Sequence, residues 1–199
     1  PHSDALARVQ YAKRAAVRAG GLGTAKLPVK HKGTCRYTLG ERMRRHHVHM
    51  HVHVLDRSGS MNMPVAGARA SQQEVANRAA ATAIESLRAE SLVGVVAFNS
   101  GASVIVPLQR NTDPAAIASS VLGIAAEGGT DIARGLIAAY EMLKDANADR
   151  RHIVCLTDGQ SSEEDLESVA ARLAADGIQL TTIGVGDEAD FETLQTVSY

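Results

Sequence analysis

Three short clusters of small, oxygen-bearing side chains are the residues of this sequence that could do chemistry. The first is Asp56-Arg57-Ser58-Gly59-Ser60, the second is Gly128-Gly129-Thr130-Asp131, and the third is Thr157-Asp158-Gly159. Carboxylates and hydroxyls offer only oxygen ligands, and such a set suits Mg²⁺, Mn²⁺ or Ca²⁺ rather than zinc. Because Ser58 and Ser60 alternate with their neighbours, both hydroxyls can turn towards one point. The candidate metal ligands are Asp56, Ser58, Ser60, Thr130 and Asp158.

The clusters are separated by apolar segments that alternate with helical patterns. Strands are expected at 48–55, 92–98, 103–108, 152–157 and 178–185. Helices are expected at 70–90, 114–122, 132–146 and 163–175, with a last one beginning near 190. Strands that alternate with helices predict an open, doubly wound α/β sheet, mostly parallel, with helices on both faces.

One strand of this sheet is expected to run antiparallel at its edge. The turn at 99–101 (Asn-Ser-Gly) joins the second and third strands as a hairpin. Pro107 in the third strand favours an edge position, because proline cannot donate to a neighbouring strand.

The apolar spacing also predicts which helix faces point inward. In the 70–90 helix the expected buried side chains are Val75, Ala79, Ala83 and Leu87. In the 132–146 helix they are Ile132, Leu136, Ile137, Tyr140 and Leu143.

In open α/β sheets, ligands bind at the carboxyl ends of the strands, near the point where strand order reverses. Two of the oxygen clusters follow strands directly, and the Thr130 cluster precedes a helix, so we expect all three at this edge. The simpler alternative is that they are ordinary turn and cap residues, since Ser, Asp and Gly favour turns. Asp131 in particular is expected to cap the helix that follows it.

Residues 46–199 resemble the von Willebrand factor A domain with its metal-ion-dependent adhesion site. The match consists of D-x-S-x-S from Asp56 to Ser60, the GGT threonine at Thr130 and the TDG aspartate at Asp158. The resemblance implies that the three hydroxyls ligate the metal, while the two aspartates act directly or through water. The stretch 107–186 looks most like bacterial members of the family. The chain departs from them in its histidine-rich first strand and in lacking a recognisable last strand and helix.

The resemblance predicts a binding module and not an enzyme. A bound Mg²⁺, or Mn²⁺ or Ca²⁺, would keep one coordination position for an acidic residue of a partner protein. A metal-dependent hydrolase built on the same oxygen cluster is the rival, but hydrolysis needs a general base beside the metal-bound water, and no candidate follows these strands. A third possibility is an assembly protein in which the metal site is vestigial.

Charge is divided unevenly along the chain, although the net charge is only −1. Residues 1–45 carry a net charge of +9 and residues 46–199 a net charge of −10. The first 45 residues are therefore expected to form a basic arm, a helix plus linker, outside the domain. Such an arm could contact an anionic surface.

Four histidines alternate along the first strand: His47, His49, His51 and His53. The H-x-H spacing is typical of a transition-metal chelate. The alternative is neutral imidazoles that bond to covering helices, or a strand left partly uncovered where the last helix is missing. The sequence leaves these interpretations open.

Several classes of function are excluded or disfavoured. No apolar run is long enough to cross a membrane, and no secretory signal is present. With only two cysteines there is no sign of an oxidising compartment, so a cytoplasmic protein is expected. There is no phosphate-binding loop of the G-x-x-x-x-G-K type, and the G-x-G-x-x-A match at 184–189 stands too late in the chain for a dinucleotide site. No nucleotide ligand is expected.

Overall fold

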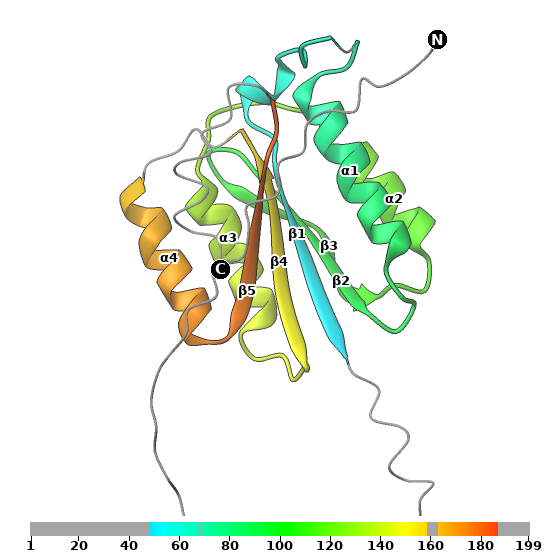
Figure 1. Cartoon of the computed structure of the whole chain (residues 1–199), viewed down its shortest axis with the longest axis vertical. Coiled ribbons are helices and arrows are strands. Elements are labelled where there is room, and N and C mark those ends of the chain that lie inside the picture. The colour runs from blue at the N-terminus through cyan, green and yellow to red at the C-terminus, as the bar shows by residue number, and fades with distance from the viewer. Residues whose placement is uncertain (1–47, 68, 159–162, 187–199) are drawn as a thin grey trace, which may run out of the picture.

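The computed structural model of the chain describes residues 48–67, 69–158 and 163–186 (Figure 1). Within these ranges it contains five strands, four α-helices and one 3₁₀ turn. The predictions for the basic arm at 1–45, for His47 and for the helix near 190 lie outside the described residues.

The strands form a single sheet in the order β3-β2-β1-β4-β5. Their bounds are β1 (His49–Asp56), β2 (Leu92–Phe98), β3 (Ala102–Arg110), β4 (Arg150–Thr157) and β5 (Ile178–Gly184). β1 pairs in parallel with both β2 and β4, β4 pairs in parallel with β5, and only β2 and β3 are antiparallel. Chain order therefore reverses at β1, which has β2 on one side and β4 on the other.

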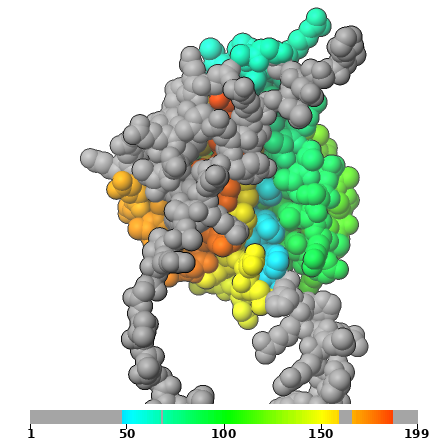
Figure 2. Space-filling model, in the orientation of Figure 1, coloured from blue at the N-terminus to red at the C-terminus, as the bar shows by residue number. Residues whose placement is uncertain are grey.

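Helices flank both faces of the sheet (Figure 1). On one side lie α1 (Gln72–Ser86) and α2 (Pro114–Leu122), and on the other lie α3 (Ile132–Leu143) and α4 (Glu163–Ala175). Each side has its own apolar core, one centred on β1, β2, α3 and α4, the other on β2, α1 and α2. In the space-filling view, parts of β1, β4 and β5 are visible between α4 and α1 (Figure 2). The predicted α/β class, with its antiparallel edge strand, is confirmed.

The predicted inward face of α1 is wrong in part. Val75 and Leu87 are partly buried and pack against the core, but Ala79 and Ala83 are exposed, and the buried apolar residues are Ala76, Ala80, Ala81 and Ile84. The predicted face is displaced because two polar side chains of α1, Gln73 and Asn77, are also buried on the inward face. There Gln73 donates a hydrogen bond to Asn77, which in turn donates to the Ile124 carbonyl. A stripe chosen from apolar residues alone therefore misplaces the face.

In α3 the prediction is confirmed for four residues and wrong for Ile137, which is 41% exposed. Gly135 explains the difference. A Cβ on Gly135 would lie 2.7 Å from Phe98, so the missing side chain lets this part of the helix approach the sheet closely. Ile137 stands about 200° further around the helix and points away.

None of the helices in the described ranges is long and apolar enough to span a membrane.

Candidate metal centre

Asp56 ends β1 and joins the loop that follows β1 to the end of β4. Its side chain is fully buried. One carboxylate oxygen accepts a hydrogen bond from the Ser58 amide at 2.7 Å, and the other accepts one from the Thr157 hydroxyl at 2.5 Å. Burial raises the pKa of Asp56, and the nearby Asp158 charge raises it further, while the bonds from Ser58 and Thr157 oppose the rise.

Ser58 and Ser60 lie together just beyond Asp56. Ser58 precedes the 3₁₀ turn η1 (Gly59–Asn62), and its hydroxyl oxygen lies 3.0 Å from that of Ser60. Met61 is fully buried and anchors this turn in the core. The two hydroxyls are therefore held side by side, as their spacing predicted.

The loop that carries Thr130 packs directly against the Ser58–Ser60 segment. The Gly59 amide donates to the Gly128 carbonyl at 2.9 Å, and the Glu127 amide donates to the Arg57 carbonyl at 2.6 Å. The Arg57 guanidinium and the Glu127 carboxylate also form an ion pair. Thr130 itself is half-buried at the end of this loop.

Asp158 is the first residue after β4 and is buried. It lies next to Thr157, whose hydroxyl bonds to Asp56, and its charge acts on the pKa of Asp56. All five predicted ligands are thus carried to the carboxyl-terminal edge of β1 and β4 and to the loop beside it. This is where chain order reverses. Their role as metal ligands stays a prediction.

The donor chemistry at this edge suits a hard divalent cation. No three His, Cys, Asp or Glu side chains within the described part of the chain are grouped so that they could hold a metal alone. A metal at Asp56 would therefore depend on the serine and threonine hydroxyls, and hydroxyl and carboxylate oxygens are ligands of Mg²⁺ and Mn²⁺. Asp131 does not add to this set in the structure. It caps α3 by accepting from the Arg134 amide, as expected.

Sequence reasoning missed Thr157 and the Arg57–Glu127 pair. The signal for Thr157 was present, since it ends a strand that was expected to lie near the first one. In the parallel register Leu55 pairs with Leu156, so Asp56 and Thr157 are the next positions along each strand. The ion pair joins residues 70 positions apart, and no local pattern predicts it.

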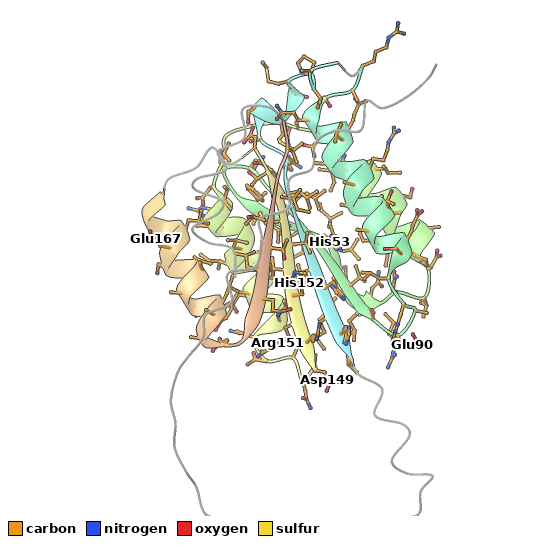
Figure 3. All side chains as sticks on the ribbon, viewed as in Figure 1. His53, Glu90, Asp149, Arg151, His152 and Glu167 are labelled. Atoms are coloured by element: carbon orange, nitrogen blue, oxygen red, sulfur yellow. The ribbon has the colours of Figure 1, made fainter. Side chains whose placement is uncertain are left out.

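The histidines on β1 pack against one another and against β4. Ring centroids of His49 and His51 are 6.4 Å apart, those of His51 and His152 are 5.8 Å apart, and both contacts are edge-on. His152 also shares a hydrogen bond with the Thr181 hydroxyl. Figure 3 shows His53 and His152 on the two neighbouring strands. The ring-to-ring contacts support packed imidazoles.

Burial, together with repulsion between neighbouring rings, lowers the pKa of His51 and of His53. Burial lowers the pKa of His51 to about 4, and the charges of His152 and His49 contribute. Burial lowers the pKa of His53 to about 3, with smaller contributions from His51 and His152.

Comparison with known proteins agrees with the fold. The von Willebrand factor type A domain matches residues 52–199. The uncharacterized protein sll0103 of Synechocystis sp. is 31% identical over 150 residues, which cover 73% of this chain and 34% of that protein. The chain thus spans about a third of the length of this relative.

Two solved structures share the fold. A von Willebrand factor type A protein from Catenulispora acidiphila is 25% identical with a TM-score of 0.64, over 75% of this chain and 36% of that one. Proximal thread matrix protein 1 from the mussel byssus, with a zinc-occupied MIDAS motif, is 21% identical with a TM-score of 0.65, over 76% of this chain and 39% of that one. The domain match covers most of the sequence, and the chain belongs to the von Willebrand factor type A domain family.

Proposed function

We propose that this chain is a divalent-metal-dependent protein-interaction module. The observation that carries the proposal is the buried Asp56 carboxylate, bonded from both sides, beside two serine hydroxyls 3.0 Å apart. In this proposal Mg²⁺ or Mn²⁺ is held by the hydroxyls of Ser58, Ser60 and Thr130, with Asp56 and Asp158 acting directly or through water. The structural relative from mussel, whose MIDAS motif holds zinc, supports a metal at such a site.

The charge of the site explains why an acidic partner residue would complete it. Three hydroxyls add no formal charge, and two aspartates add at most −2. A divalent ion held mainly by neutral hydroxyls stays attractive to an incoming carboxylate, which brings both an oxygen and a negative charge. Residues 46–199 carry a net charge of −10, so an acidic partner is repelled at long range without the ion. Binding should therefore require the metal.

The same geometry disfavours hydrolysis. A hydrolase needs a carboxylate or imidazole free to take a proton from metal-bound water. Both oxygens of Asp56 already accept hydrogen bonds, and Glu127 is paired with Arg57. These carboxylates hold loops in place.

Calorimetric titration with Mn²⁺, Mg²⁺ and Zn²⁺ tests the metal site. Zinc is included because the mussel relative holds it, although the oxygen-only donor set favours the other two ions. Asp56→Asn keeps an acceptor for the Ser58 amide and can donate to Thr157, so the fold should survive while the charge is lost. We expect the wild-type chain to bind Mn²⁺ and the variant to bind at least about tenfold more weakly. Equal affinity in the two proteins would refute the assignment.

A further inference from the structure

The turn between β2 and β3 lies against the loop that carries Thr130. The Asn99 side-chain amide donates to the Glu127 carbonyl at 3.1 Å, and the Ser100 hydroxyl accepts from the Gly129 amide at 3.1 Å. Asn99 is itself fixed by Gly101. Its side-chain oxygen accepts a hydrogen bond from the Gly101 backbone amide, and its backbone amide donates one to the Gly101 carbonyl. The side chains of Asn99 and Ser100 thus both form hydrogen bonds with the backbone of the neighbouring loop.

The two glycines before Thr130 fit this contact. Gly128 has φ +83°, and a Cβ there would lie 3.2 Å from the Asn99 side-chain nitrogen. A Cβ on Gly129 would lie 2.7 Å from the Ser100 hydroxyl. The paired glycines therefore let the turn approach the loop backbone closely enough for both hydrogen bonds.

The other side of the loop is held by the Arg57–Gly59 segment. Gly59 donates to the Gly128 carbonyl, and Arg57 contacts Glu127 through backbone and side chain. The backbone of 127–129 is therefore clamped between two segments, directly before the hydroxyl of Thr130.

We infer that Asn99 and Ser100 are positioning residues of the proposed metal centre. Their described hydrogen bonds go to Glu127 and Gly129, on either side of Gly128, and through these bonds they set the position of Thr130. The inference rests on the proposed function. Mg²⁺ and Mn²⁺ demand near-octahedral oxygen positions, so a loop that relaxes presents its hydroxyl poorly. Partners that orient metal ligands in this way typically change metal affinity by about 10–100-fold.

The test compares the double variant Asn99→Ala/Ser100→Ala with Asn111→Ala in the full chain. Asn111 is a matched control, because its buried side-chain amide donates to the carbonyls of Ile84 and Leu87 at the opposite end of the sheet. The measurements are Mn²⁺ affinity by calorimetry and Tm in EDTA. We expect the double variant to bind Mn²⁺ about 10–100-fold more weakly, and Asn111→Ala to lower Tm while leaving Mn²⁺ affinity unchanged.

The outcomes separate this inference from the proposed function. If the wild-type chain fails to bind Mn²⁺, both are overturned. If the wild-type chain binds and the double variant binds equally well, the inference alone is wrong. Should the double variant not fold, Ser100→Ala alone supplies the same comparison, because Ser100 is exposed and loses one hydrogen bond only. Unchanged Mn²⁺ affinity in that variant would likewise overturn the inference.

Discussion

The bond between Thr157 and Asp56 links β1, where chain order reverses, to its neighbour β4. A carboxylate buried at this edge is stabilised by hydrogen bonds in place of water, and Thr157 supplies one of the two described bonds to it. Because the acceptor is a carboxylate, this bond is worth more than a neutral one. Thr157 is therefore important to the stability of the metal-free domain.

Thr157→Val removes the hydroxyl and keeps the shape of the side chain. We expect the free energy of unfolding in EDTA to fall by about 1.5–3 kcal/mol, the usual range for a hydrogen bond to a charged group. Urea denaturation measures the change. Thr112→Val, on an exposed residue before α2, is the control and should change stability by less than about 0.5 kcal/mol. Similar changes in the free energy of unfolding for the two variants would show that the hydrogen bond from Thr157 to Asp56 does not stabilise the domain.

At the scale of elements, the strands were more predictable than the helix faces. Apolar runs placed each strand to within two residues, and the Asn-Ser-Gly turn with Pro107 identified the antiparallel edge pair. The inward face of α1 was predictable only in part, because Gln73 and Asn77 are buried through hydrogen bonds that the sequence does not reveal. The pairing of the Ser58 and Ser60 hydroxyls was predictable from local spacing. The bond between Asp56 and Thr157, 101 residues apart, depends on the register of β1 and β4, and no pattern predicts the Arg57–Glu127 ion pair, 70 residues apart.

The contacts between histidines of β1 and β4 depend on how the two strands are aligned in the sheet. His51 lies directly beside His152 in the parallel pairing, and no spacing within β1 predicts that neighbour. His53 is 3% exposed, and neither ring nitrogen has a hydrogen-bond partner among the residues that the structure describes. A neutral imidazole tolerates this position better than a charged one.

The buried histidines predict that the domain loses stability in acid. Their pKa values in the folded chain, about 4 for His51 and about 3 for His53, lie below the ordinary 6.5. As pH falls, the histidines of the unfolded chain are therefore protonated before those of the folded chain. The free energy of unfolding is at its full value above pH 6.5 and falls between pH 6.5 and pH 4. The slope for one buried histidine is at most about 1.4 kcal/mol per pH unit.

Urea denaturation of the wild-type chain and of His53→Leu between pH 7 and pH 4 measures this effect. We expect a shallower decline in the variant, which cannot be protonated at this position. Identical pH dependence in the two proteins would mean that His53 is accessible to protons in the folded state.

At the scale of the whole molecule, the candidate oxygen ligands lie at one edge of the sheet, within a part of the chain that is negatively charged overall. The loop after β1, the end of β4 and the loop before α3 meet at the end of the sheet opposite to Asp149 and Arg151, which Figure 3 shows at the other end of β4. With a net charge of −10 on residues 46–199, a divalent cation at this edge would offset the negative charge of Asp56 and Asp158. A partner carboxylate would then be attracted only where the ion lies.

A crystal structure of the chain grown with Mn²⁺ tests the proposed metal centre most directly, because manganese can be located by its anomalous scattering. We predict one strong peak at the carboxyl-terminal edge, about 2.1 Å from the hydroxyl oxygens of Ser58, Ser60 and Thr130. A remaining coordination position should be filled by water or by a carboxylate from a neighbouring molecule. No manganese at this edge at saturating concentration, or manganese only elsewhere on the chain, would contradict a metal-dependent interaction through these residues.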